Sequence, residues 1–474
     1  MSPLPRILLV TLGTALVSAC AVGPNYKRPP ADSGASFKEL GDWKPSEPAD
    51  TLDRGPWWQM FKDPVLEQLE QQIDVSNQTL KAAADAYRQA QALVDQSKAG
   101  FWPTISGSAA HTRQQGQSVQ GLGSGPSTLT STYSVGASAS WELDVWGAVR
   151  RSVESNFAAA QSSAAALAGT RLLEQATLAS DYFQLRAQDE LKRILDQTVD
   201  DEQKSLKITQ NQYAVGVAAK ADVVTAQTQL LASQAQQINA GIQRATLEHA
   251  IAVLVGQLPS AFSIAPVPTM PADVPTVPVG LPSSLLERRP DVAEAERKMQ
   301  SENALIGVAI SAYFPSLTLA GSGSYQSSTL SNLITASNRV WSFGPELAVS
   351  LFDGGLRRAQ TAQARAVYDQ SVDNYRQTAL TAFQQVEDDL ATLRILEQQA
   401  VVEDETVKMA KEAERLVLNQ YKAGTVPYSS VITAQNTTFS AEQAALTVLQ
   451  TRLTTSISMI EALGGGWSTQ QLPK

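Results

Sequence analysis

The chain has 474 residues, two histidines, one cysteine and a formal net charge of −9. Its Lys and Arg residues are dispersed and form no basic tract, which argues against nucleic acid as a partner. A single cysteine excludes an intramolecular disulfide, and the length allows two or three domains.

Residues 1–19, MSPLPRILLVTLGTALVSA, are typical of an export signal peptide, because one charge, Arg6, precedes an apolar run and then small residues. Cys20 follows directly, at a position similar to the lipobox of bacterial lipoproteins. The similarity implies acylation of Cys20, palmitate included, and Ala21 after it implies sorting to the outer membrane. No later segment reaches the ~18 apolar residues of a spanning helix, so we expect any membrane span to be β.

Residues 20–56 are expected to form an extended N-terminal segment outside the packed core, since proline and polar residues recur throughout it. A helix is expected to begin at Asp63-Pro64, where an aspartate can cap the first turn and a proline suits the first helical position. The helical pattern then runs through LEQLEQQIDVSNQTLKAAADAYRQAQALVDQSKA.

Residues 57–256 form the first of two predicted structural repeats. A helix is predicted from about 153 to 213, because this stretch lacks proline, has glycine only at Gly169, and repeats apolar residues three or four apart. At 1.5 Å per residue it would be roughly 90 Å long. The chain turns at a tip of about 213–222, where Gly216 allows the turn, and returns as a second helix of an antiparallel hairpin. The predicted seam consists of Leu172, Ala176, Ala179, Phe183, Ala187, Leu191 and Ile194.

The same repeat contains two predicted strands, at about 102–118 and 130–146. In the second strand, apolar and aromatic residues from Tyr133 to Val145 alternate with small and polar ones from Ser134 to Asp144. This alternation fits a strand with lipid on one face and water on the other. A soluble, half-buried sheet would have the same pattern, but the export signal, the lipid anchor and the lack of apolar helices favour the membrane.

A proline-rich connector at 257–290, a composition that excludes helix and central strand, leads to the second repeat at 291–464. The segment NQYKAGTVPYSSVITAQ at 419–435 matches NQYAVGVAAKADVVTAQ at 211–227 in 8 of 17 positions, in a register of 419 − 211 = 208. The chain is therefore duplicated. The second repeat has predicted strands at about 313–327 and 343–353, helical arms at 359–421 and 428–463, and a tip at about 421–430; residues 465–474 form a tail.

The predicted fold is mainly α with a membrane β part. Four strands per chain cannot close a barrel, and an open sheet edge is not tolerated in lipid, so we expect several chains to share one barrel. A single helical hairpin of this length also lacks a core until it packs against others. Both observations predict an oligomer.

Several segments, together with the two tips, resemble the outer membrane factor (TolC-like) family of bacterial efflux and type I secretion systems, in its nodulation-type lipoprotein branch. They are CAVGPNYKRP, WWQMFKDPVLEQL, FWPTIS, WELDVWGAVRR, LLERRPDVAEAE, FPSLTL and SLFDGG. The resemblance implies a homotrimer in which each chain gives four transmembrane strands to one outer membrane β-barrel and its long helical hairpins to a periplasmic α-barrel tunnel.

Such a trimer, by the same resemblance, is a passive duct for small molecules: drugs and other toxic compounds, metals or siderophores. The traits implied are efflux and multidrug resistance. The implied partners are outer membrane lipid, a periplasmic membrane-fusion adaptor, and an inner membrane pump of the RND, ABC or MFS type.

The resemblance also assigns the two tips to the periplasmic gate and the adaptor-docking site. Asp222 matches an acidic residue that holds the entrance closed in some relatives, and Tyr421 matches a tyrosine of the family motif. The chain departs from the family at two places. Val426 stands where some members have the arginine of the closing ion pair, and Ser430 and Thr433 stand where many members have the aspartates of an acidic ring. Each tip residue could equally serve only to turn or pack a helix end. The candidate residues are Tyr213, Gly216, Asp222, Tyr421, Gly424, Ser430 and Thr433.

Nothing in the sequence predicts catalysis, a cofactor or a metal site. Neighbouring carboxylates at Glu387–Asp389 point in different directions on a helix and indicate a solvated face. His111 and His249 have no second ligand at metal-binding spacing, and phosphate-cradling and nucleophile-elbow motifs are missing. The alternative to an export duct is a lipid-anchored periplasmic coiled-coil adaptor or scaffold that spans no membrane; the alternating strands favour the duct.

Overall fold

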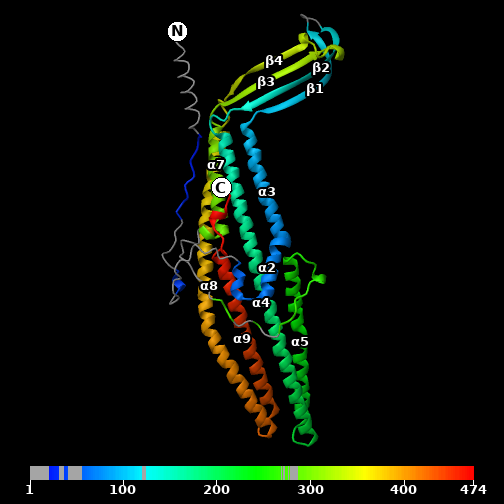
Figure 1. The fold of residues 1–474 in the computed structure, drawn as a ribbon, viewed down its shortest axis with the longest axis vertical. Helices are drawn as coiled ribbons and strands as arrows, with labels where there is room; N and C mark the ends of the chain where they lie inside the picture. The colour runs from blue at the N-terminus through cyan, green and yellow to red at the C-terminus, as the bar shows by residue number, and fades with distance from the viewer. Residues whose placement is uncertain are drawn as a thin grey trace. The chain divides into compact units, whose positions relative to one another are not determined.

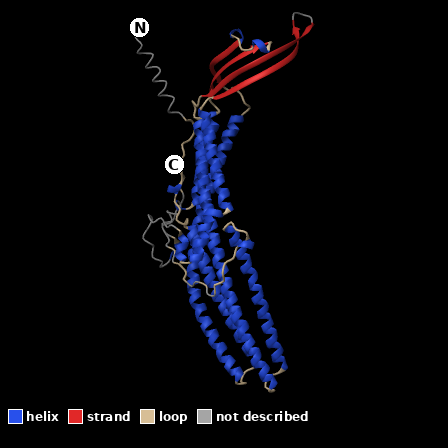
Figure 2. Ribbon diagram, turned by 45° about the vertical axis from the view of Figure 1, so that its right-hand side comes forward, coloured by secondary structure: helices blue, strands red, loops and turns tan. Residues whose placement is uncertain are grey.

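The computed structural model describes residues 21–30, 37–40, 56–119, 124–267, 270, 273–275, 277 and 287–473, which form helices and one antiparallel sheet (Figures 1 and 2). The predicted signal peptide and Cys20 lie outside these residues. The chain divides into two compact units. The strand unit takes the described residues up to 30, 87–163 and 295–375, and the hairpin unit takes those within 31–86, 164–294 and 376–474. Within the described part, no helix is both long and apolar enough to cross a membrane.

The helices repeat the duplication of the sequence. Helices α4 and α8 each have 67 residues, and α5 and α9 each have 35. The starts of the two pairs differ by 356 − 148 = 208 and by 428 − 220 = 208, which is the register of the two tip segments. The bounds are α2 Pro64–Ser76, α3 Gln78–Lys98, α4 Ala148–Ala214, α5 Lys220–Leu254, α7 Pro290–Ser311, α8 Leu356–Lys422 and α9 Tyr428–Ala462.

The first helical segment differs from the sequence pattern, because it is two helices rather than one. Asp63 caps α2 as predicted, accepting hydrogen bonds from the backbone N–H groups of Val65 and Leu66 at 2.9 and 3.1 Å. Asn77 is extended, with ψ at 126°. Its Oδ1 accepts a hydrogen bond from Leu80 N at 2.8 Å, so a side-chain cap starts α3 where the backbone leaves α2.

The connector at 257–290 is not wholly free of helix, as its prolines had suggested. Pro259–Ala261 form a short 3-10 helix, η4, and Glu287 and Arg288 have helical backbone. Pro290 is the first residue of α7. A proline at this position costs no hydrogen bond, because the first N–H groups of a helix have no partner inside it.

The sheet has strands β1 Thr104–Val119, β2 Ser124–Glu142, β3 Ser316–Ser327 and β4 Arg339–Ala348, in the order β1-β2-β3-β4 with every pair antiparallel (Figure 1). β2 starts before the predicted 130 and ends before 146, and β4 starts before 343 and ends before 353. The predicted ends are wrong because the chain turns after each of these strands, where an aspartate, Asp144 or Asp353, caps the next helix.

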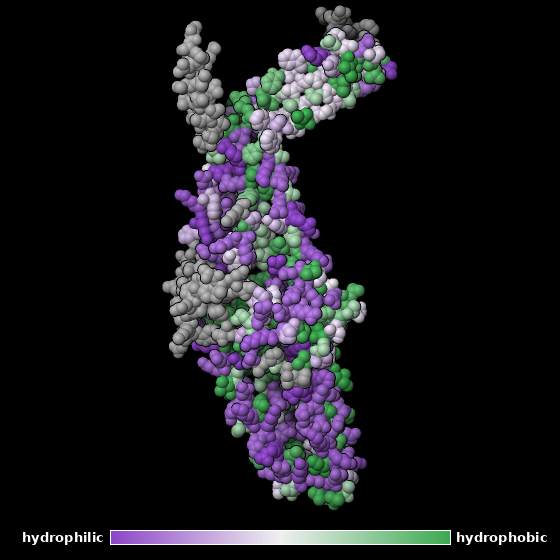
Figure 3. Space-filling model, in the orientation of Figure 1, coloured by the Kyte–Doolittle hydropathy of each residue, from purple (hydrophilic) through white to green (hydrophobic). Residues whose placement is uncertain are grey.

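The strand register sorts the side chains by chemistry. Directly paired residues lie on the same face of a sheet. One face has the row Ile105, Ala139, Gly321 and Phe343, and the next residue of each strand gives the opposite face its row of Ser106, Ser138, Ser322 and Ser342. Phe343 and Ile105 are 70% and 75% exposed, and no strand residue whose side chain is described is buried. Pale and green surface predominates on the sheet in Figure 3.

Two equivalent hydrogen-bonded turns, each built on an aspartate, join the sheet to the long helices. The Asp144 carboxylate accepts hydrogen bonds from Val149 N at 2.9 Å and from Nε of Arg150 at 3.1 Å. In the second repeat the Asp353 carboxylate accepts from Gly355 N and from Nε of Arg357. Each aspartate thus fixes the first turn of α4 or α8, which explains the recurring aspartate, glycine and arginine of these two segments.

The N-terminal segment contributes to packing, contrary to the expectation for residues 20–56. In the strand unit, Arg151 of α4 holds it by donating to Val22 O at 3.1 Å and to Oδ1 of Asn25 at 2.8 Å. In the hairpin unit, Phe37 is buried in the main apolar cluster with Trp57. Phe37 is therefore part of the core although it belongs to no helix or strand.

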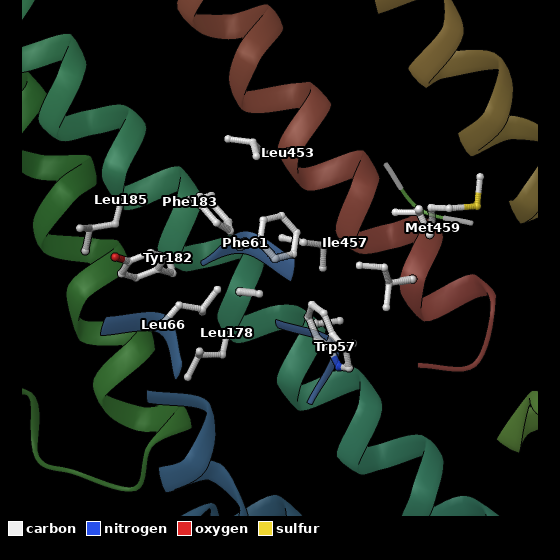
Figure 4. Close-up of a cluster of buried hydrophobic side chains, with 14 of the residues drawn as sticks. Trp57, Phe61, Leu66, Leu178, Tyr182, Phe183, Leu185, Leu453, Ile457 and Met459 are labelled. Carbon is white, nitrogen blue, oxygen red and sulfur yellow. The ribbon is translucent and has the colours of Figure 1, made fainter. Parts of the chain in front are cut away.

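The main core lies in the hairpin unit. Phe61 packs on Phe183 with ring centroids 4.9 Å apart, and Leu453 and Ile457 of α9 join them (Figure 4). Most of the predicted seam is buried, and Leu191 is half-buried. The buried seam residues are Leu172, Ala176, Ala179, Phe183, Ala187 and Ile194.

Candidate functional site: the two hairpin tips

The two turns that end the hairpins have the same backbone. Gly216 and Gly424 follow helices α4 and α8 with φ of +80° and +75°. The N–H of Gly216 donates to Tyr213 O at 3.0 Å, and that of Gly424 donates to Tyr421 O at 2.9 Å. These are αL caps, in which glycine adopts positive φ without a steric penalty. The two tips lie side by side in both ribbon views (Figures 1 and 2).

A pair of tyrosines forms the core of the second tip. Tyr421 lies in the last turn of α8 and Tyr428 begins α9, and their ring centroids are 5.3 Å apart. They are 4% and 2% exposed. Val431 of α9 and Ala226 of α5 complete the buried cluster, so helices of both hairpins contribute to it.

Hydrogen bonds also link the two hairpins. The Tyr421 hydroxyl donates to Oγ1 of Thr209 on α4 at 3.0 Å, and Nε2 of Gln212 donates to the Tyr421 carbonyl oxygen at 3.1 Å. Burial raises the pKa of Tyr421, so its hydroxyl stays protonated and remains a donor. The second tip is therefore held to α4 through both its side chain and its backbone.

A buried polar layer follows, farther from the turns. Oε1 of Glu202 on α4 accepts hydrogen bonds from Nε2 of Gln229 and Oγ of Ser233, both at 3.0 Å. Gln435 of α9 donates to Oγ of Ser205 at 3.1 Å. Burial raises the pKa of Glu202.

Three atoms of this region have no hydrogen-bond partner among the described residues: Oε2 of Glu202, the Tyr428 hydroxyl and Oε1 of Gln435. Glu202, Tyr428 and Gln435 are 1%, 2% and 6% exposed. Unpartnered buried polar atoms carry a desolvation cost of about 1 to 3 kcal/mol each. The contact between the hairpins is therefore less stable here than an apolar core of the same size would be.

The remaining candidate residues lie on the surface of the tips. Tyr213 is 47% exposed. Asp222 accepts a hydrogen bond from Ala219 N at 3.1 Å and makes no salt bridge within the described residues; its side chain acts as the cap of α5. Val426 packs against the tyrosine cluster.

Ser430 and Thr433, near the start of α9, are uncharged. Ser430 is half-buried, and the Thr433 hydroxyl donates back to Ser429 O at 3.0 Å. Thr433 lines an open groove of about 560 Å³ whose other residues are all uncharged. They are Thr406, Asn436, Thr437, Ser440 and Ala441.

Sequence reasoning missed the residues that hold the tips together: Glu202, Thr209, Tyr428 and Gln435. Tyr428 had a usable signal, because the register of the duplication places it opposite Lys220 and so marks a departure from the repeat. Glu202 gave none, since a glutamate on a long helix is ordinarily solvated.

The carboxylates at Glu387–Asp389 are not simply a solvated face. Both oxygens of Glu387 accept backbone N–H groups, those of Lys38 and Glu39, at 2.7 and 2.9 Å. Burial raises the pKa of Asp389 to about 6, and its Oδ2 accepts from Ser458 Oγ at 3.0 Å. Their partners differ because neighbouring positions on a helix point apart. In the described part of the chain, no three His, Cys, Asp or Glu side chains are grouped to hold a metal ion.

Comparisons with known proteins match this architecture. The family model described as outer membrane efflux protein matches residues 69–257 and 281–465. The toluene efflux pump outer membrane protein TtgC of Pseudomonas putida is 30% identical over 471 residues, which cover 98% of this chain and 96% of that protein. The pyoverdine export outer membrane protein OpmQ of Pseudomonas aeruginosa is 30% identical over 464 residues, covering 96% and 97%.

The solved structure of the outer-membrane channel OprN superposes with a TM-score of 0.87 at 28% identity, over 94% of this chain and 100% of that one. The match extends along nearly the whole chain, so it includes the duplicated hairpins, the four-stranded sheet and the sequence motifs. The chain belongs to the outer membrane efflux protein family.

Proposed function

We propose that three copies of this chain form a passive duct, in which the sheets close into one β-barrel and the hairpins line a periplasmic tunnel. Membership of the family makes the chain an outer membrane efflux channel of a tripartite system. The proposal adds how the chain is used: as one third of a barrel and one third of a tunnel.

The observation that carries the proposal is the sheet. One face is apolar, with Trp341 and Phe343 69% and 70% exposed, and the other is mainly serine, threonine and glycine. Among the described residues, the outer strands β1 and β4 each have one edge that pairs with no other strand. The two faces and the edges of the sheet would each have a suitable neighbour in a barrel: lipid would cover the apolar face, water the polar face, and another copy of the chain would pair with each edge.

The tips serve as the tunnel entrance and as the docking site for a periplasmic adaptor. Both turns expose side chains, among them Tyr213, Val215 and Val217 on the first. The residues that gate the entrance are those of the tips, namely Tyr213, Gly216, Asp222, Tyr421, Gly424, Ser430 and Thr433. An inner membrane pump, coupled to the duct through the adaptor, would provide the energy; the sequence itself contains neither a phosphate-cradling nor a nucleophile-elbow motif.

Small molecules are the proposed cargo. The relatives named above are both 30% identical to this chain, yet one is named for toluene and the other for pyoverdine. One duct architecture therefore accompanies chemically different cargo. We assign the choice of cargo to the pump and the adaptor, with the duct accepting what they deliver.

A lipid anchor at Cys20 would supplement the barrel. The support comes from the sequence, in which small residues precede the cysteine. Cys20→Ser should abolish acylation and leave trimers in the outer membrane, since a barrel binds the bilayer more strongly than acyl chains do.

The decisive experiment measures native mass and single-channel conductance of the detergent-purified protein. We expect a trimer that forms pores in planar bilayers. A monomer, or a trimer without conductance, would contradict the duct and favour the lipid-anchored scaffold.

A further inference from the structure

An open cavity of about 560 Å³ lies between α4, α8 and α9, away from the hairpin tips. All of its lining residues belong to the hairpin unit. Cavities of this size are typical of sites for small organic molecules. Because α4 belongs to the first hairpin and α8 and α9 to the second, an occupant would contact both hairpins of one chain.

The floor of the cavity is apolar. Ile194 of α4, Met270 of the connector and Leu446 of α9 line it and are buried, and Leu449 is half-buried. Such a floor suits the apolar body of a ligand, while a few polar groups around it would fix the orientation.

Most of the charged side chains in the lining already have partners. Three of them form ion pairs with a neighbouring side chain of opposite charge, and Glu403 accepts a hydrogen bond from Nε2 of Gln399 at 3.3 Å. The ion pairs are Arg193 with Glu190, Lys411 with Glu442 and Lys408 with Glu405, with N to O distances of 2.8, 2.6 and 3.3 Å.

Two charged side chains of the lining have no such partner within the described part of the chain. Arg452 of α9 is half-buried, and Asp404 of α8 is exposed at the rim. Neither side chain makes a hydrogen bond or an ion pair with a described residue. Oε2 of Glu190 is buried and has no hydrogen-bond partner there either. The cavity therefore presents one unpaired cation, one unpaired anion and one buried acceptor.

The duplication shows what Arg452 lacks. Its equivalent is Arg244 of α5, since 452 − 208 = 244, and Nε of Arg244 donates to Oδ1 of Asp189 at 2.7 Å. The equivalent of Asp189 is Glu397, since 189 + 208 = 397, and Glu397 is exposed on α8. The second repeat has thus kept the cation and lost its buried anionic partner. A ligand carboxylate at Arg452 would replace that partner with a charge-assisted hydrogen bond.

The spacing of the two unpaired charges sets the length of a ligand. α8 and α9 meet at one turn, so depth is counted from it: Lys411, at 422 − 411 = 11, pairs with Glu442, at 442 − 428 = 14. Asp404 is at 422 − 404 = 18 and Arg452 at 452 − 428 = 24. Six residues correspond to about 9 Å along the helices. Leu449, at 449 − 428 = 21, lies midway between them.

We propose that this cavity binds a small zwitterionic amphiphile, an organic molecule with a carboxylate at one end, an ammonium at the other and an apolar body between. The carboxylate lies on Arg452, the ammonium on Asp404 and the body on Leu449 and Ile194. A hydroxyl or amine of the ligand donates to Oε2 of Glu190. A ligand with only one of the two charges would leave the other side chain unpaired.

Isothermal titration calorimetry of the detergent-purified protein tests the site, with micelles alone as the blank. The probe is 4′-(aminomethyl)biphenyl-4-carboxylic acid, whose two charges lie at opposite ends of two aromatic rings. Biphenyl-4-carboxylic acid lacks the ammonium, and 4-biphenylmethylamine lacks the carboxylate. We expect the zwitterion to bind about tenfold more tightly than either analogue, because each charged end gains a hydrogen bond.

Two variants separate the ends of the ligand. Arg452→Gln should weaken binding of the zwitterion about tenfold and leave the affinity for 4-biphenylmethylamine unchanged. Asp404→Asn should also weaken binding of the zwitterion and leave the affinity for biphenyl-4-carboxylic acid unchanged. Arg415→Gln is the control, because Arg415 lies on α8 outside the cavity lining; it should alter neither affinity.

The unaltered protein alone can overturn the proposal, whether or not the variants fold. Equal affinities for the three probes, or no heat above the micelle blank, would show that the cavity does not select a zwitterion. Binding of the zwitterion that survives both substitutions would place it elsewhere. A protein that is monomeric or forms no pores would contradict the duct and not this site, because one chain builds the whole cavity.

Discussion

The two hairpin tips have the same backbone and different interiors. Their helices have equal lengths and their glycines nearly equal φ, as expected of a duplication. Yet Tyr421 is 4% exposed and its equivalent Tyr213 is 47% exposed. Tyr428, which packs on Tyr421, has Lys220 as its equivalent, since 428 − 208 = 220.

This difference indicates that the two tips are stabilised in different ways. The second tip has a core of its own and uses α4 of the first hairpin as its hydrogen-bonding partner through Thr209. At the first tip the equivalent tyrosine, Tyr213, is exposed, and Asp222 caps the helix that follows the turn. Duplicated backbones that no longer share side chains can differ in local stability. In the proposed gate, the second tip would be the part that holds and the first the part that moves.

The largest effect should come from emptying the tyrosine core. Tyr421→Ala removes a buried ring and the bond to Thr209, and should cost about 3 to 5 kcal/mol of local stability. Tyr213→Ala, at the equivalent exposed position, should change stability by at most about 0.5 kcal/mol. Hydrogen exchange at residues 423–427 and at 215–219 measures the two effects. Equal protection losses would contradict the distinction between the tips.

Charge offers a second way to sharpen the comparison. Ser430 is equivalent to Asp222, since 430 − 208 = 222, so only the first tip has a carboxylate at this position. In planar bilayers, a trivalent cation added on the tunnel side should block the current through the Ser430→Asp, Thr433→Asp variant more strongly than the current through the unaltered protein. Each carboxylate about 5 Å from the cation would contribute roughly 1 to 3 kcal/mol per unit charge, at effective dielectric constants between 80 and 20.

The matched control is Ser430→Asn, Thr433→Asn, which has similar size without charge. Block of the aspartate variant should weaken as salt rises, because exposed charges are screened. If the unaltered protein is blocked as tightly as the aspartate variant, either Asp222 or another carboxylate already forms the ring, or these positions do not face the ion path.

The polar layer predicts a pH dependence at the contact between the hairpins. Burial raises the pKa of Glu202 above its unfolded value of about 4.3, so the packed state binds the proton more tightly than the unfolded chain does. The stability at this position is therefore complete below about pH 4.3 and is lost as pH rises through the folded pKa.

Glu202→Gln should remove this dependence. Its melting temperature should match that of the unaltered protein in acid and exceed it increasingly as pH rises through the folded pKa of Glu202. Glu397→Gln, at an exposed position of α8, is the control and should leave the pH profile unchanged. A profile that Glu202→Gln does not flatten would contradict the assignment.

The comparison also shows which features are readable from sequence. Helix lengths, turn positions and the buried seam follow from periodicity and from glycines such as Gly216 and Gly424, because these depend on the backbone and on local pattern. The break at Asn77 was missed, since one residue capping a new helix leaves the apolar period intact. Strand ends were misplaced where Asp144 and Asp353 take over as helix caps.

Side-chain partners distant in sequence were the least predictable part of the site. Nothing local distinguishes the exposed Tyr213 from the buried Tyr421, because each follows the same Asn-Gln pair. Their difference arises from which helix each faces. Glu202 was passed over for the same reason, since its burial depends on Gln229 and Ser233 of another helix.

The smallest expected effect concerns the feature that the two tips share. Gly216→Ala and Gly424→Ala each place a Cβ on a residue with positive φ, which costs roughly 1 kcal/mol. No described atom lies within 4 Å of either added Cβ, so backbone strain is the whole cost and should be equal at the two sites. Hydrogen exchange of the two turns measures both. Because the second tip has a core as well as a turn, the same strain should raise exchange only around Gly424 itself and spread farther along the helices from Gly216. Equal spread on both sides would mean that the tyrosine core does not stabilise the second turn.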